Sequence, residues 1–183
     1  MDKKTKILIC GTPGTGKSST LKEIKINETL KIGLSEFCIK KKIVKKEEVE
    51  ISKLQKKLAK EIAEAEEKMV IVEGHLGCEL RGIFNTIIVL RCEPKKLEKR
   101  LEKRKYSKQK ILDNLVSELL DYCTLKSMEN NPRSKVIEIR SDRHKSKEIA
   151  RKIEKMIKLK KFKGEKVSFK LNNYKEYLRR DVL

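Results

Sequence analysis

One eight-residue stretch constrains the fold of this chain more than any other feature. It reads Gly11-Thr-Pro-Gly-Thr-Gly-Lys-Ser18 and matches the pattern G-x-x-x-x-G-K-[ST]. The apolar run Lys6–Cys10 before it is typical of a buried parallel strand, and a helical pattern from Lys17 to about Ile26 follows. Glycines let such a loop wrap until its backbone N–H groups point inward, and the helix that follows adds its dipole. The stretch therefore predicts a phosphate-binding loop between a strand and a helix.

The same motif gives two of its side chains expected roles. Lys17 would bridge the β- and γ-phosphates of a nucleoside triphosphate, and Ser18 would ligate Mg²⁺.

Strand and helix patterns alternate along the rest of the chain. Further strands are predicted at Thr29–Gly33, Met69–Gly74, Thr86–Leu90 and Val136–Ile139. Helices are predicted at Glu36–Lys42 with Ser35 as N-cap, at Ser52–Glu67, from Pro94, from about Ile111 to Leu120, and around Ile149–Ile157. The alternation predicts an α/β fold with a five-stranded parallel sheet and helices on both faces. Residues 162–183 fit no such unit; a tail, a small hairpin and an arm that docks on a partner are all open.

An acidic residue stands at the end of the strand predicted at Met69–Gly74. Glu73 occupies the place where P-loop proteins put an acid that holds Mg²⁺, usually through water, although the usual residue is Asp. His75 follows two residues later. Both a role in a cleft and an ordinary surface position are open for this histidine.

Three arginines are candidates for contact with phosphate. Arg91 follows a predicted strand, and Arg100 and Arg104 are four residues apart, so they share a face of one helix. Beside a break in the helix at Lys105–Lys108, their guanidinium groups would neutralise charge that builds up on a transferred phosphate. The alternative for Arg100 is a solvated ion pair with a nearby glutamate.

The charge balance is a separate constraint. The 183 residues carry 47 Lys and Arg against 27 Asp and Glu, a net charge of +20. From Arg140 onward there are 16 basic and 6 acidic residues, a net +10, and Lys40–Lys46 is a second basic stretch. The excess fits a polyanion partner such as RNA, or a background rich in lysine and glutamate of the kind found in hyperthermophile proteins.

Membrane and metal-site signals are weak. No apolar run approaches the roughly 18 residues that cross a bilayer, and the N-terminus has no signal-peptide pattern, so we expect a soluble, cytoplasmic protein. Five scattered cysteines favour reduced, buried thiols over a zinc site. They are Cys10, Cys38, Cys78, Cys92 and Cys123.

The combination of motifs resembles the archaeal and eukaryotic adenylate kinase isoenzyme six family. The resemblance covers about Lys6 to Lys160 and rests on Gly11–Ser18, Glu73-Gly-His75 with Gly77-Cys78, Val89-Leu-Arg91, and Arg104-Lys-Tyr106…Lys110…Asn114…Glu118. It implies a P-loop NTPase of the nucleoside monophosphate kinase type, with a domain at 1–161. The basic C-terminal extension at 162–183 has no counterpart in that family, and nothing carries over to it. Within the domain the resemblance implies a monophosphate-binding region at about 30–53 and a short lid at about 103–113.

The resemblance also implies the site. The residues that would hold ATP are Gly14, Gly16, Lys17, Ser18, Ser19 and Arg104. The catalytic set would be Lys17, Glu73, His75 and Arg104, with Ser18 and Glu73 at the metal. Arg100 joins this catalytic set because of its position on the helix, one turn before Arg104. The histidine is associated with ATP hydrolysis in that family. Ser35, Glu36 and Lys40 would lie near the start of the monophosphate-binding region.

Two compatible functions and one alternative follow. The first is a Mg-ATP-dependent kinase that converts ATP and AMP to two ADP. The second is an ATPase that acts in small ribosomal subunit and rRNA maturation, with rRNA and a platform protein of the small subunit as implied partners. The alternative is a polynucleotide or small-metabolite kinase on the same scaffold.

Overall fold

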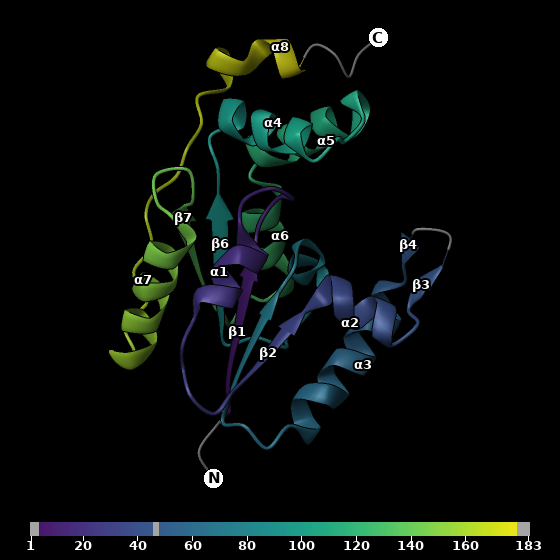
Figure 1. Cartoon of the computed structure of the whole chain (residues 1–183), viewed down its shortest axis with the longest axis vertical. Coiled ribbons are helices and arrows are strands. Elements are labelled where there is room, and N and C mark those ends of the chain that lie inside the picture. The colour runs from purple at the N-terminus through teal and green to yellow at the C-terminus, as the bar shows by residue number, and fades with distance from the viewer. Residues whose placement is uncertain (1–3, 46–47, 179–183) are drawn as a thin grey trace.

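Five parallel strands form the central sheet of the computed structural model, which describes residues 4–45 and 48–178 (Figure 1). The strands are β1 (Thr5–Cys10), β2 (Thr29–Gly33), β5 (Met69–Glu73), β6 (Thr86–Arg91) and β7 (Lys135–Arg140). They lie in the order β2-β5-β1-β6-β7, and each neighbouring pair is parallel. The predicted fold class is confirmed.

The other elements are helices and one short hairpin. In chain order they are α1 (Lys17–Glu23), α2 (Leu34–Lys40), β3 (Val44–Lys45), β4 (Glu48–Val49), α3 (Ile51–Glu64), η1 (His75–Glu79), α4 (Pro94–Lys103), α5 (Lys108–Leu119), α6 (Tyr122–Asn130), α7 (Ser146–Lys158), η2 (Leu171–Tyr174) and α8 (Lys175–Leu178). No helix among the described residues is long and apolar enough to cross a membrane.

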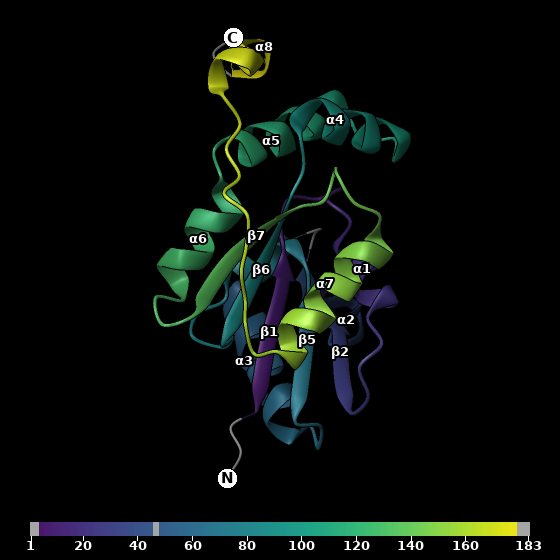
Figure 2. The ribbon, with the colours of Figure 1, turned by 90° about the vertical axis from the view of Figure 1, so that its left-hand side faces the viewer.

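Successive side chains of each strand point alternately to the two faces of the sheet, and helices cover both faces. In β1, Leu8 and Cys10 pack on the face covered by α2, α3, η1 and α6, whereas Ile7 and Ile9 pack on the face covered by α1 and α7. Figure 2 shows α1 and α7 beside each other, with α6 on the opposite side. Burial of each such aliphatic side chain stabilises the fold by about 1.5–3 kcal/mol, and each face of the sheet has its own apolar cluster.

Local structure departs from the sequence prediction at several places. Helix α1 ends at Glu23 rather than at about Ile26, and α2 spans Leu34–Lys40 rather than Glu36–Lys42. Ser35 is not an N-cap: β2 runs directly into α2, whose N-cap is Gly33. Helix α3 ends at Glu64 rather than at Glu67. The β3–β4 hairpin and helix α6 were not predicted. Helix α6 follows Asp121, whose φ of 54° is left-handed and breaks the helical path after α5.

The C-terminal segment packs on its own domain. Phe162 joins the core on the α7 side, and the Glu165 N–H donates to the Glu138 carbonyl at the edge of β7 (2.9 Å). Further on, Val167 and Phe169 enter a third apolar cluster with the side chains of α4 and α5. Figure 1 shows this segment rising past β7 and ending in α8 above α4. Residues 179–183 lie outside the described part of the chain, as does Lys46.

Gly164 tests this docking. A Cβ at this position would lie 2.9 Å from both the backbone nitrogen and the backbone oxygen of Glu138, which the sheet holds in place. We expect Gly164→Ala to lower the free energy of unfolding by about 1–3 kcal/mol, measured by urea denaturation. Lys163→Ala, at the exposed neighbouring position, should stay within about 0.5 kcal/mol of the parent protein. Equal stability of the two variants would contradict the docking.

Candidate functional site

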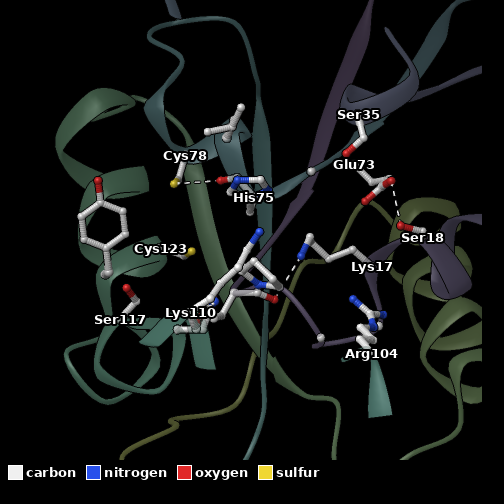
Figure 3. Close-up of a pocket in the computed structure, with 18 of the residues that line it drawn as sticks. Lys17, Ser18, Ser35, Glu73, His75, Cys78, Arg104, Lys110, Ser117 and Cys123 are labelled. Atoms are coloured by element: carbon white, nitrogen blue, oxygen red, sulfur yellow. Dashed lines mark hydrogen bonds between the residues drawn. The ribbon is translucent and has the colours of Figure 1, made fainter. Parts of the chain in front are cut away.

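A cavity of about 610 Å³ opens at the carboxyl end of the sheet (Figure 3). Strand β1 lies between β5 and β6. The chain continues from β1 to β2 on one side of it, and later crosses from β5 to β6 on the other side. In parallel α/β sheets, such a switch point leaves a crevice beyond the strand ends where ligands bind. The wall of the cavity is built from several parts of the chain: the loop after β1, the end of β5, η1, α2, β4, the α4–α5 junction, α5 and α6.

The loop between β1 and α1 has the backbone that its glycines predict. Gly11 and Gly14 have φ angles of 134° and 93°. A Cβ on Gly11 would lie 2.3 Å from the Leu90 carbonyl oxygen, and one on Gly14 would lie 2.8 Å from Leu97 Cδ1. The dihedral angles therefore favour glycine at both positions, and at Gly11 the Leu90 backbone also leaves no room for a side chain.

Lys17 is folded back over this loop. Its Nζ donates to the carbonyl oxygens of Gly11 (2.8 Å) and Thr12 (3.1 Å), and its side chain is buried. Burial lowers the pKa of the ammonium group below its ordinary value. Because both partners are neutral carbonyls, phosphate oxygens would compete effectively for this cation.

Ser18 and Glu73 lie together as the sequence predicts for a metal site. The Ser18 hydroxyl donates to Glu73 Oε1 at 2.9 Å, and Glu73 is 7% exposed (Figure 3). These oxygen donors fit Mg²⁺, which prefers oxygen ligands and retains several waters. No group of three or more His, Cys, Asp or Glu gathers as a metal site within residues 4–45 and 48–178. Phosphate oxygens and water would therefore complete the coordination of a bound Mg²⁺.

His75, the first residue of η1, places its side chain in the cavity (Figure 3). Partial desolvation there lowers its pKa to about 4, and the ammonium groups of Lys17 and Lys110 add to the effect. The imidazole is therefore neutral at pH 7, with a nitrogen able to accept a proton. An anionic ligand beside it would raise this pKa by neutralising the two lysines.

The three candidate arginines occupy different environments. Arg104, the C-cap of α4, lines the cavity. Arg100 lies behind the loop instead, with Nη1 3.3 Å from the Gly14 carbonyl oxygen and Nη2 3.5 Å from that of Ser141. In this arrangement Arg100 holds the loop from outside, and its contact with a transferred phosphate remains a prediction.

Arg91 does not face the cavity, so the prediction that it contacts phosphate is wrong. It is 1% exposed and forms ion pairs with Glu118, Asp121 and Glu138. Its apolar surroundings make carboxylate partners necessary, because an unpaired buried charge is costly. The position at the end of a strand indicated the switch-point edge but not the direction of the side chain.

The structure adds wall residues that motif reasoning did not assign to the site. Lys110, Asn114 and Ser117 line the cavity from α5, and Tyr122 and Cys123 line it from α6. The first three are separated by four and three residues, so a common helix face was a usable signal. The contribution of α6 depends on the turn at Asp121 and had no such signal.

The remaining predicted residues divide between the wall and the surface. Gly14, Gly16, Ser19 and Ser35 line the cavity, and Glu36 and Lys40 are exposed without lining it. All five cysteines are buried, as predicted.

Comparison with known proteins identifies the family. A family profile described as an AAA domain matches residues 7–121. The Methanocaldococcus jannaschii protein named "Putative adenylate kinase" is 35% identical over 162 residues, which cover 85% of this chain and 88% of that protein. The chain belongs to the family of archaeal putative adenylate kinases. An Archaeoglobus fulgidus relative of the same name is 33% identical over 157 residues, covering 83% of this chain and 82% of its own.

Solved structures agree on the fold of this family member. Shikimate kinase from Acinetobacter baumannii in complex with shikimate has a TM-score of 0.62 at 13% identity, covering 88% of this chain and 97% of its own. Shikimate kinase from Bacteroides thetaiotaomicron has a TM-score of 0.56 at 14% identity, covering 84% and 98%. At such identity the likeness shows the fold alone.

The lowered pKa of His75 makes a prediction about stability. Since the folded-state pKa of about 4 lies below the ordinary 6.5, the unfolded chain binds this proton more strongly between those pH values. We expect the free energy of unfolding of the parent protein, relative to His75→Gln, to be constant above pH 7 and to fall as the pH drops from 6.5 to 4. Urea denaturation at pH 7.5, 5.5 and 4.5 measures this difference. A constant difference across this range would contradict the lowered pKa.

Proposed function

We propose that the protein transfers the γ-phosphoryl group of Mg-ATP to a nucleoside monophosphate, with AMP as the first acceptor to test. One observation carries the proposal: a single cavity joins the loop residues Lys17 and Ser18 to Arg104 from the predicted lid and to Ser35 from the predicted monophosphate region. Its volume of about 610 Å³ is typical of sites for small ligands. The adenylate kinase name of the archaeal relatives supports the same acceptor.

The side chains suit chemistry that depends on positioning and charge. Lys17 would exchange its carbonyl partners for the β- and γ-phosphates, while Arg104 and Lys110 approach from the α4–α5 side. Closure of the lid at about 103–113 over the region at about 30–53 would exclude water from the transfer. Bound Mg²⁺ at Ser18 and Glu73 would supply charge neutralisation.

Lys17→Ala tests the proposal directly. Loss of the ammonium group should lower kcat for ADP formation from ATP and AMP by about 10²–10³-fold, because a cation aimed at developing charge is removed. A coupled assay for ADP or ³¹P NMR measures the rate. Lys22→Ala removes an exposed lysine from the same helix and should leave the rate unchanged. Full activity of Lys17→Ala would overturn the assignment of the loop.

A second candidate function is ATP hydrolysis in the maturation of the small ribosomal subunit. The observation that favours it is the neutral imidazole of His75 in the cavity, which could orient a water molecule and accept its proton. The net charge of +20 supports contact with rRNA, since only a few of these cations line the cavity. A platform protein of the small subunit is the proposed protein partner, on the family resemblance alone.

ATP turnover without AMP separates the two candidates. If hydrolysis has this role, a small-subunit rRNA fragment should raise ADP release, and the stimulation should fall steeply with salt as phosphate contacts are lost. His75→Ala should lose about 10²-fold or more of this hydrolysis but keep transfer to AMP. His144→Ala, a half-exposed histidine at the start of α7, is the matched control. Hydrolysis at the parent rate by His75→Ala would remove this histidine from the mechanism.

A further inference from the structure

We propose that the C-terminal segment positions the loop at residues 11–18 for nucleotide binding through one of its residues, Phe169, from which a buried chain of contacts leads to the loop. The contacts run from Phe169 through Arg91 and Glu118 to Thr12. The inference rests on the proposed binding of nucleotide by this loop. It gives a function to the segment that the sequence alone could describe as a tail, a small hairpin or a docking arm.

Glu118 on α5 is the centre of this chain of contacts. It is 1% exposed, and both of its carboxylate oxygens are occupied. Oε1 accepts from Arg91 Nε (2.9 Å) and from the Cys92 backbone N–H (2.9 Å), while Oε2 accepts a short hydrogen bond from the Thr12 hydroxyl. A single carboxylate therefore connects the end of β6 to the phosphate-binding loop.

Thr12 transmits this position to the catalytic lysine. Its carbonyl oxygen accepts from Lys17 Nζ (3.1 Å), from the Thr15 backbone N–H (3.2 Å) and from the Thr15 hydroxyl (2.9 Å). A shift of Thr12 would thus move the backbone on which Lys17 rests. A displacement of this kind changes the geometry of the phosphate cradle without touching the nucleotide.

Arg91 orients Glu118 and is itself fixed from the other side. Its Nη2 donates to the Glu118 carbonyl at 2.8 Å and to the Asp121 carboxylate, and its Nη1 donates to Glu138. The Arg91–Glu118 pair is buried, so a loss of alignment would leave both charges without a partner and without water to replace it. The guanidinium is consequently sensitive to whatever covers its remaining face.

The C-terminal segment covers that face. The Phe169 ring lies with its centroid 5.3 Å from Arg91 Cζ and 5.1 Å from Arg140 Cζ, within the range of cation–π attraction. Two residues earlier, the Val167 backbone N–H donates to Glu138 Oε2 at 3.3 Å. The segment therefore holds both Arg91 and one of its carboxylate partners.

Other aromatic residues of the segment bind elsewhere and provide the control. The Tyr174 hydroxyl donates to Glu93 Oε1 (2.8 Å) and the Tyr177 hydroxyl to Glu98 Oε2 (2.6 Å), both at α4. Tyr177 is 5% exposed and Phe169 is 8% exposed, and both belong to the third apolar cluster. Replacing either by leucine disturbs the packing of the segment, but only Phe169 touches Arg91.

The experiment compares Phe169→Leu with Tyr177→Leu by calorimetric titration of ADP, alongside thermal unfolding. Phe169→Leu should weaken ADP binding by about threefold to tenfold, since the cation–π contact with the buried Arg91 guanidinium and the partly buried Arg140 guanidinium is lost. Tyr177→Leu should lower the unfolding temperature by a similar amount and leave ADP affinity unchanged. Equal ADP affinity in Phe169→Leu and the parent protein would overturn the proposal and reduce the segment to packing.

Thr12→Val tests the route. It removes the hydroxyl that meets Glu118 while keeping the shape of the side chain, and should weaken ADP binding by about tenfold or more. Adding Phe169→Leu to Thr12→Val should cause no further loss, because the connection is already cut. Additive losses would overturn the route. If the parent protein itself bound no ADP, the proposed function would fail instead, so the two failures are distinguishable.

Discussion

The structure depends on the complete burial of the last four residues of β1. Ile7, Leu8, Ile9 and Cys10 have no exposed surface, because helices cover both faces of the strand and β5 and β6 pair with both of its edges. A strand held in this way delivers the following loop to one fixed point at the centre of the sheet edge. The glycine-rich backbone, the start of α1 and the crevice of the switch point then coincide there. The buried, central position of β1 therefore fixes the position of the cavity.

Two buried cations near this point show how partners decide what a charge can do. Lys17 rests on neutral backbone carbonyls, which a polyphosphate can replace at little cost. Arg91 is held by three carboxylates, and turning it toward a ligand would leave the buried Glu118 carboxylate without its cation. Lys17 is therefore available to a ligand, whereas Arg91 is fixed as part of the scaffold. The same reasoning explains why Arg91 suits a positioning role.

The excess positive charge also divides by location. A small share lines the cavity, where Lys17, Arg104 and Lys110 suit a phosphate-rich ligand. Much of the rest lies on helix surfaces, in part paired with acidic neighbours such as Lys60 with Glu64. The C-terminal segment was a candidate arm for a partner, but its residues Val167, Phe169, Tyr174 and Tyr177 pack on its own domain. Any contact of residues 162–178 with a polyanion would therefore use their exposed lysines.

The sequence by itself determined the fold class, the phosphate-binding loop and the pairing of Ser18 with Glu73. Local rules suffice for these features: periodicity identifies the strands, glycine spacing shapes the loop, and parallel strands bring their carboxyl ends together. Three features were decided only by the tertiary structure. They are the direction of the Arg91 side chain, the interruption of the helical path between α5 and α6 at Asp121, and the packing of the C-terminal segment on α4 and α5. These outcomes follow from competition for buried partners among residues far apart in the sequence, such as Arg91 and Phe169. No local pattern encodes that competition, because its result depends on which polar and charged groups become buried and need a partner within the folded protein.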